Sequence, residues 1–183
     1  MKTLRHGLEM LFRPLYGWDE VKDQENAWSS LAYAVFLLVV STALQFLLFD
    51  KGGGNSSFGW QTASRIKWLT IGSIAIIAGL AVNVVVVYQF PPLFDGSKDL
   101  SSAVKLVAFS STPYFIAAVV NSILHYKMVG ALIAAYSFVL FWNGLHKIMR
   151  SPPSKRGAYF VVTTIIILLA YVVLTFTLAT MLI

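Results

Sequence analysis

The sequence predicts an all-α, polytopic integral membrane protein: a five-transmembrane-helix bundle with an amphipathic N-terminal cytoplasmic helix. The first observation behind this prediction is composition. Hydrophobic residues make up 57% of the 183 residues and charged residues only 12%, about half the charged share of a soluble domain. So few polar side chains cannot cover the surface of a water-soluble domain of this size. The composition therefore excludes a soluble enzyme, a disordered segment and, because there is no cysteine, a disulfide-rich secreted scaffold.

The second observation is the position of the charges along the chain. They leave five uncharged runs of 18 to 27 residues, and about 20 helical residues cross a hydrocarbon core of roughly 30 Å. A transmembrane β-barrel would instead show alternating polar and apolar residues, and apolar runs such as 31–40 show no alternation. We expect an N-terminal segment, residues 1–27, and a five-helix domain, residues 28–183. The expected spans are about 28–49, 67–90, 103–124, 128–147 and 158–182.

Residues 3–18 have the pattern of an amphipathic helix. Leu4, Leu8 and Leu11 recur at helical spacing with charged residues between them, and Pro14 should end or kink this helix. Two placements stay open: in the cytoplasmic membrane interface with the apolar face in lipid, or packed on the cytoplasmic end of the bundle. The span that follows is too long, and lies too far behind a mixed-charge segment, for a cleaved signal peptide, so we expect it to be retained.

The connectors between the spans contain turn and capping residues. The glycine-rich run 52–57 is expected to be a flexible connector rather than a phosphate loop, because no Gly-Lys-Ser/Thr ending follows it. Pro91 and Pro92 end the second helix, and Ser97 or Asp99 can cap the third. The connector between the third and fourth spans is so short that these two helices must form an antiparallel hairpin.

The distribution of basic residues predicts the orientation. Connectors on the side of the N-terminus carry ten Lys and Arg residues, and those on the other side carry four. Because cytoplasmic loops are the basic ones, we expect a cytoplasmic N-terminus and a non-cytoplasmic C-terminus. Lys147, Arg150, Lys155 and Arg156 form a basic cluster without an acidic neighbour in the sequence. We interpret this cluster as an orientation signal that also attracts anionic lipid, and we expect no binding of nucleic acid.

Ionisable side chains are absent from the middle of every expected span, where they usually mark function. This pattern argues against a proton-coupled transporter, a voltage sensor and a carboxylate-based membrane hydrolase. The histidines are His6, His125 and His146, and the last two lie at opposite ends of one helix, so they cannot share a zinc ion. We interpret the histidines as interfacial residues and expect no catalytic residue, no cofactor and no metal site.

Neutral polar residues and a proline within the spans form a candidate polar and kink cluster: Asn83, Ser111, Pro113, Asn121 and Asn143. Amides in lipid usually hydrogen-bond a neighbouring helix, each bond contributing about 1 kcal/mol, and this structural role is favoured over ligand binding. Pro113 removes a backbone donor and should kink the third span, with the preceding hydroxyls bonding the opened backbone. A polar pocket at this kink stays an alternative.

Most of the large amphipathic aromatic residues lie near the ends of the expected spans, as in an aromatic interface belt. Anchoring at the membrane surface accounts for them without any ligand. The expected anchors are Trp18, Trp28, Trp60, Trp68, Tyr88, Tyr126, Trp142 and Tyr159.

Several segments resemble the Yip1-domain family, in particular its prokaryotic five-span members. Residues 10–21 are similar to the family's opening pattern of Leu, Pro and Trp, although Gly17 stands where an acidic residue often precedes the Trp. Residues 108–114 resemble the family's span with a small residue, Ser and Pro, and residues 138–146 its leucine-rich end with Gly-Leu, followed at 152–158 by the opening of the last helix. The resemblance to prokaryotic members implies five spans and, for this chain, a prokaryotic inner membrane, but no reaction and no substrate. Eukaryotic members are associated with small GTPases and vesicle membranes, and that partnership is not carried over.

From these features we expect a non-enzymatic membrane protein, either a membrane-organising scaffold or an accessory, partner-binding subunit. Expected partners are membrane lipids and either another membrane protein or a second copy of the chain. The candidate contact surfaces are residues 8–21, with Pro14 and Trp18, and the basic loop 147–156. The alternative is a small transporter or channel with a polar path near the Pro113 kink.

Overall fold

A computed structural model describes residues 2–24, 26–48, 58–124 and 127–182, and within them the chain forms helices joined by short turns. Among these described residues five segments are long and apolar enough to cross a membrane. They confirm the predicted all-α, five-span fold class. The segments are Ala27–Leu47, Thr70–Gln89, Leu100–Leu124, Met128–Lys147 and Pro153–Leu174.

The helices extend beyond the apolar spans at two places. α4 begins at Phe58, well before the expected start at 67, and α8 begins at Pro153 rather than 158. The helical backbone continues into polar sequence, because hydropathy marks where a helix enters lipid and not where it starts. Residues 50–57 of the expected connector at 50–67, including its glycine run, lie outside the described residues. The elements are α1 (Lys2–Phe12), α2 (Pro14–Gln24), α3 (Ala27–Leu48), α4 (Phe58–Gln89), η2 (Pro91–Phe94), α5 (Leu100–Ser110), α6 (Thr112–Leu124), α7 (Lys127–Lys147) and α8 (Pro153–Leu182).

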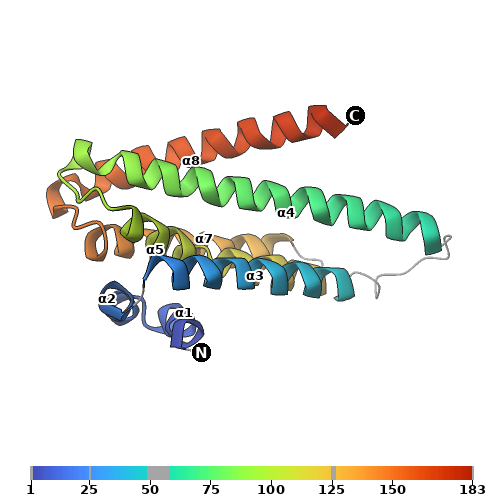
Figure 1. Ribbon diagram of the computed structural model, residues 1–183, viewed down its shortest axis with the longest axis horizontal. Coiled ribbons are helices and arrows are strands. Elements are labelled where there is room, and N and C mark those ends of the chain that lie inside the picture. Colours follow the sequence, from blue (N-terminus) through green and yellow to red (C-terminus); the bar gives the residue numbers. More distant parts are fainter. Residues whose placement is uncertain (1, 25, 49–57, 125–126, 183) are drawn as a thin grey trace.

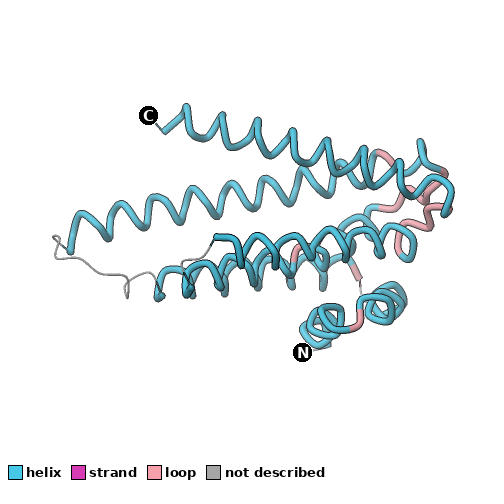
Figure 2. Tube along the Cα trace, turned by 180° about the vertical axis from the view of Figure 1, so that it is seen from behind, coloured by secondary structure: helices cyan, strands magenta, loops and turns pink. Residues whose placement is uncertain are grey.

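The five spans form two layers (Figure 1). α4 and α8 lie side by side in one layer, and α3, the α5–α6 pair and α7 form the other. We call the end at which α3, α5 and α8 begin the proximal end; most of the turns drawn in pink in Figure 2 gather there. α5–α6 is the central span, since 56% of it is buried against 11% for α4. α6 and α7 pack as the predicted antiparallel hairpin, and Gly130 leaves room for the Asn121 side chain between them.

α1 and α2 lie across the bundle near its proximal end. Figure 1 looks nearly along their axes, whereas the spans run across the view. Pro14 separates the two helices, as predicted, because its ring fits the first position of α2 and cannot continue α1. Met10 and Val21 are fully buried, so of the two placements the structure shows the one packed on the bundle.

An aromatic core holds the proximal end together, and two of its members correct the interface-belt prediction. Trp18 is fully buried; its indole nitrogen donates to the Leu140 carbonyl at 3.1 Å, and its ring meets Phe109 edge-on at 6.5 Å. Gly144 is required beside it, because a Cβ there would collide with the Trp18 ring and with Leu106. Trp18 is therefore a core residue and not a surface anchor.

Tyr159 is the second aromatic residue that is buried rather than interfacial. Its ring stacks on Phe94 at 5.1 Å, and its hydroxyl donates to the Val87 carbonyl at 2.9 Å. The Val87 carbonyl needs this donor because its ordinary helical partner would be the backbone N–H of residue 91, which is a proline. The tyrosine of α8 thus completes the end of α4.

Asp99 caps the N-terminus of α5, which is one of the two alternatives predicted from the sequence. The Asp99 carboxylate accepts hydrogen bonds from the backbone N–H groups of Ser101 and Ser102 at 3.2 and 2.9 Å. The Ser102 hydroxyl, which also donates to it, holds the pKa of Asp99 below its ordinary value. Ser97 does not cap α5; its backbone N–H and hydroxyl both donate to the Met149 carbonyl.

Candidate functional site

The third span is broken in its middle, as predicted. α5 ends at Ser110 and α6 begins at Thr112, because Pro113 cannot donate to the Phe109 carbonyl. The Ser111 hydroxyl donates to the Val107 carbonyl at 2.8 Å, so it bonds a neighbouring carbonyl and not the one that Pro113 leaves open. The Tyr33 and Thr112 hydroxyls meet at 2.9 Å and tie the break to α3.

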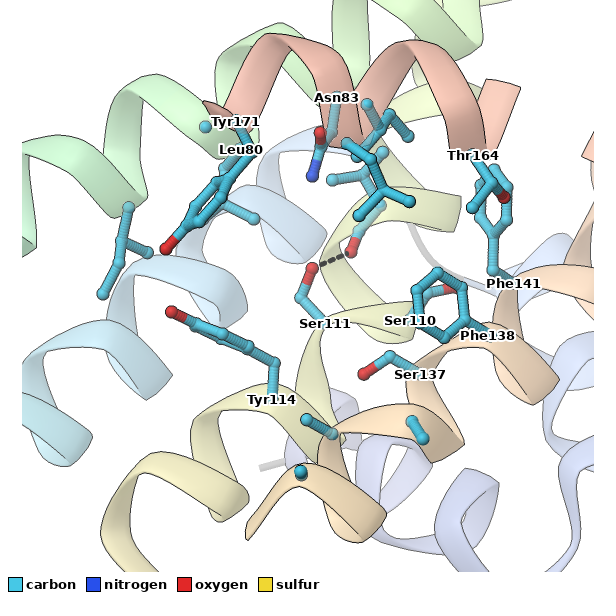
Figure 3. A pocket seen from close by; sticks show the side chains of 18 residues that line it. Leu80, Asn83, Ser110, Ser111, Tyr114, Ser137, Phe138, Phe141, Thr164 and Tyr171 are labelled. Carbon is cyan, nitrogen blue, oxygen red and sulfur yellow. Dashed lines mark hydrogen bonds between the residues drawn. The ribbon is translucent and has the colours of Figure 1, made fainter. Parts of the chain in front are cut away.

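A cavity of about 460 Å³ lies between the two layers beside this break. We call it the interlayer cavity. Figure 3 shows Asn83 of α4 facing Ser111 across it, and the hydroxyls of Tyr114 and Tyr171 pointing toward one another. Most of its wall is aliphatic or aromatic. Its polar lining residues are Asn83, Ser110, Ser111, Tyr114, Ser137, Thr164 and Tyr171.

Three of the lining hydroxyls are buried without a hydrogen-bond partner within the described chain: those of Ser110, Ser137 and Thr164. The Ser110 side chain belongs to a residue only 6% exposed. A serine or threonine in a membrane helix usually bonds the carbonyl one turn earlier, as Ser111 does. An unsatisfied buried hydroxyl costs about 1–3 kcal/mol, so these three groups are a feature that packing alone does not explain.

A second cavity of about 500 Å³ adjoins the first and shares Tyr114, Ala131 and Ala134 with it. Asn121 lines this second cavity, and its side-chain oxygen is buried without a partner among the described residues. Asn143 lines neither cavity, and its amide donates to the Val139 carbonyl one turn back at 3.0 Å. The predicted cluster is therefore divided: Asn83 and Ser111 share one cavity, Asn121 lines the other, and Asn143 does not belong to it.

Comparison with family models identifies a Yip1 domain over residues 8–176. The chain belongs to the Yip1 family. The match runs from the middle of α1 to the last part of α8, so it includes the N-terminal helices as well as all five spans. It confirms the resemblance seen in the sequence, and it makes the protein a multi-pass membrane protein of this family. Neither the curated proteins nor the solved structures contain a match to the chain.

The basic cluster of this Yip1 protein has acidic partners, in contrast to its neighbourhood in the sequence. The Lys147 ammonium lies 2.7 and 2.8 Å from the two carboxylate oxygens of Asp19 in α2, and Lys155 pairs with Asp95. Arg156 lies over the Trp142 ring at 5.6 Å, while Arg150 is exposed. The cluster thus fastens α2 and the turn after η2 to the ends of α7 and α8.

The structure also places the two predicted contact residues of α2 in this Yip1 protein. Pro14 is half-buried at the start of α2, and Trp18 is buried inside the protein, so Trp18 cannot contact a partner or lipid.

His6 is buried rather than interfacial, with Nε2 lying 3.4 Å from a Glu20 carboxylate oxygen. His146 places Nδ1 at 3.2 Å from the Ser151 carbonyl. His125 lies outside the described residues. Within the described ranges no three metal-ligating side chains come together.

The hydroxyl residues of the interlayer cavity are what the sequence prediction missed. Ser137, Thr164 and both cavity tyrosines were not in the predicted cluster. The sequence spacing contained a signal for Tyr114, Thr164 and Tyr171. Ser110 and Tyr114 are four residues apart, and Thr164 and Tyr171 are seven apart, so each pair shares one face of a helix.

Proposed function

We propose that this Yip1 protein is a non-enzymatic membrane protein that organises the membrane or holds a partner protein at its proximal end. The observation that supports this is the rigid attachment of α1 and α2 to the bundle. Besides Trp18 and the Lys147–Asp19 pair, the Tyr136 hydroxyl donates to the Leu11 carbonyl at 3.1 Å and Lys105 to the Lys22 carbonyl at 3.2 Å. A surface held in place before binding loses little conformational entropy when a partner docks.

The side of α1–α2 that faces away from the bundle carries large apolar side chains. Phe12 is 84% exposed, Tyr16 75% and Leu15 55%. We call these three residues the corner patch. Exposed apolar groups that are adjacent in this way usually mark contact with a protein or a membrane. The corner patch and the loop 147–156 are the contact surfaces that we propose.

The proposed orientation places the proximal end in the cytoplasm of a prokaryotic cell, with the C-terminus outside. Ten of the fourteen basic residues belong to connectors on the proximal side or to the N-terminal segment, as cytoplasmic loops require. In this orientation α1 and α2 lie parallel to the membrane at its cytoplasmic surface. The proposed partners are membrane lipids together with a membrane protein or a second copy of this chain.

Site-specific photocrosslinking in native membranes tests the proposal. Benzoylphenylalanine at Tyr16 should give a discrete protein adduct, because the corner patch faces the partner. The matched control is the same probe at Leu132, an equally exposed residue on α7, which should label lipid only. Identical labelling at both positions would contradict a dedicated contact surface. Hydrolysis of a lipid or peptide by the purified protein, abolished by Ser111→Ala, would contradict the non-enzymatic role.

A small transporter or channel is the second candidate, favoured by the adjoining cavities with Asn83 and Asn121. The mainly apolar lining weighs against a path for polar solutes. Solute flux into liposomes that is lost on Asn83→Leu would support this candidate. Asn143→Leu is the matched control, because Asn143 lines neither cavity and should leave any flux unchanged.

A further inference from the structure

The chemistry of the interlayer cavity restricts what can occupy it. None of the described residues that line it is charged, so a charged ligand would lose its hydration without gaining a counter-ion from them. The buried hydroxyls of Ser110, Ser137 and Thr164 each carry a proton without an acceptor among the described residues. Unsatisfied buried donors are rarer in proteins than under-used carbonyl oxygens. The occupant that fits is therefore neutral and supplies a hydrogen-bond acceptor.

The size of the cavity favours a small molecule over a protein segment. Its volume of about 460 Å³ falls in the range of small-molecule pockets, roughly 300–1,000 Å³. A transmembrane helix about 10 Å wide and 30 Å long would need several times this volume. The rings of Phe138, Phe141 and Tyr114 on the wall offer flat apolar faces to a planar group.

The depth of the hydroxyls argues against an ordinary glycerolipid. Ser137 lies at the centre of α7, and Ser110 lies near the centre of the Leu100–Leu124 span. Each end of α7 is thus about 15 Å away along the helix. The ester carbonyls of a glycerolipid stay at the edge of a hydrocarbon core of roughly 30 Å, so they do not reach this level.

We propose that the interlayer cavity binds a neutral lipophile whose carbonyl oxygen enters the middle of the membrane and accepts hydrogen bonds from Ser110, Ser137 or Thr164. A quinone head group has this chemistry. The binding site goes beyond the proposed role at the proximal end and involves none of the corner patch, so either proposal can fail without the other.

The test uses the full chain in lipid nanodiscs and an azido-ubiquinone analogue with a decyl tail. After illumination, adducts are mapped by mass spectrometry. We expect them on residues of the cavity wall, and we expect unlabelled decylubiquinone to compete for them at a saturable site. A diazirine-bearing dioctanoylglycerol is run in parallel as the probe anchored at the interface.

Two glycines of α4 give a matched pair of variants. An added Cβ meets no atom within 4 Å at either Gly72 or Gly79, and only Gly79 lines the cavity. Gly79→Leu should fill the cavity and abolish labelling, while Gly72→Leu should label like the wild type. Circular dichroism and gel filtration serve as the controls for the folding of both variants.

Removal of the hydroxyls tests the contact itself. Ser110→Ala with Thr164→Val should raise the half-inhibitory concentration of decylubiquinone about tenfold, since two hydrogen bonds are lost. The control is Ser122→Ala with Thr177→Val, whose hydroxyls bond their own helices, and it should cause no change. The proposal is overturned if only the dioctanoylglycerol probe labels the cavity, if labelling is not saturable, or if the Gly72 and Gly79 variants behave alike.

Discussion

The aromatic core at the proximal end, which contains Trp18, Phe109, Phe94 and Tyr159 and which we call the proximal core, differs from the interlayer cavity in its packing. Both are lined by aromatic and hydroxyl side chains, but only the proximal core is closely packed. At the proximal end Trp18 and Tyr159 are fully buried, and the polar atom of each ring donates to a backbone carbonyl. In the cavity wall the hydroxyls of Ser110 and Thr164 are buried but have no partner in the described chain. The buried aromatic rings of the proximal end thus have their polar atoms satisfied, although Ser151 Oγ and Arg156 Nε at the same end also lack a partner among the described residues.

The largest expected effect in this comparison is at Trp18. Trp18→Ala leaves a cavity in the proximal core and should lower the free energy of unfolding by about 3–5 kcal/mol. Trp28→Ala is the matched control, because Trp28 is 79% exposed, and its effect should stay within about 0.5 kcal/mol. Denaturant unfolding in detergent, followed by circular dichroism, measures both. Equal stabilities would show that the proximal core is not the tightly packed region.

Tyr159→Phe should have the second largest effect. The substitution keeps the stacked ring but removes the donor to the Val87 carbonyl, which should cost about 1–3 kcal/mol. In the cavity the same kind of change has the opposite sign: Thr164→Val removes an unsatisfied group and should be neutral or stabilising in ligand-free detergent. Thermal unfolding of the two variants compares the regions directly, and destabilisation by both would remove the contrast.

Asp99→Ala should destabilise the protein by about 1 kcal/mol, because α5 loses its N-cap. The pKa of Asp99 is lowered by the Ser102 hydroxyl, so the carboxylate stabilises the fold above its ordinary pKa near 3.8. This stabilisation disappears as the pH falls through the lowered pKa. Unfolding measured against pH should show the variant and the wild type converging in strong acid. A constant difference at all pH values would contradict capping by the charged form.

The smallest expected effect is at the Asp19–Lys147 pair. Both side chains are partly exposed, and such pairs contribute about 0.2–1 kcal/mol. A double-mutant cycle with Asp19→Asn and Lys147→Met should give a coupling energy in this range that declines with added salt. A coupling energy above this range, or one insensitive to salt, would place the pair within the proximal core.

The sequence predicts the five spans and the α6–α7 hairpin well, and it names Asp99 as one of two candidate caps, because each of these depends on local features. Uncharged runs, a short connector and a capping residue before a helix are properties of neighbouring residues. The break at Pro113 is predicted for the same reason. These local features set the positions of the helices that surround the interlayer cavity, but they do not predict the cavity itself.

The rest of the structure depends on contacts between distant segments. Trp18 and Tyr159 have the residue type and position of interface anchors, and only the tertiary fold shows that they are buried. The partner of Lys147 is 128 residues away in the sequence, so the basic cluster looked unpaired. The open space beside Ser110 follows from the distance between two layers, which no local pattern encodes.

The hydrogen bond from Trp18 to Leu140 also has a consequence for the order of assembly. The two residues are 122 positions apart, and at about 5–20 residues per second a ribosome needs roughly 6 to 24 s between them. The binding position for Trp18 is complete only after α7 has been synthesised. α2 can therefore make this contact with the bundle only after α7 has been synthesised, so the docking of the N-terminal helices follows the synthesis of the fourth span.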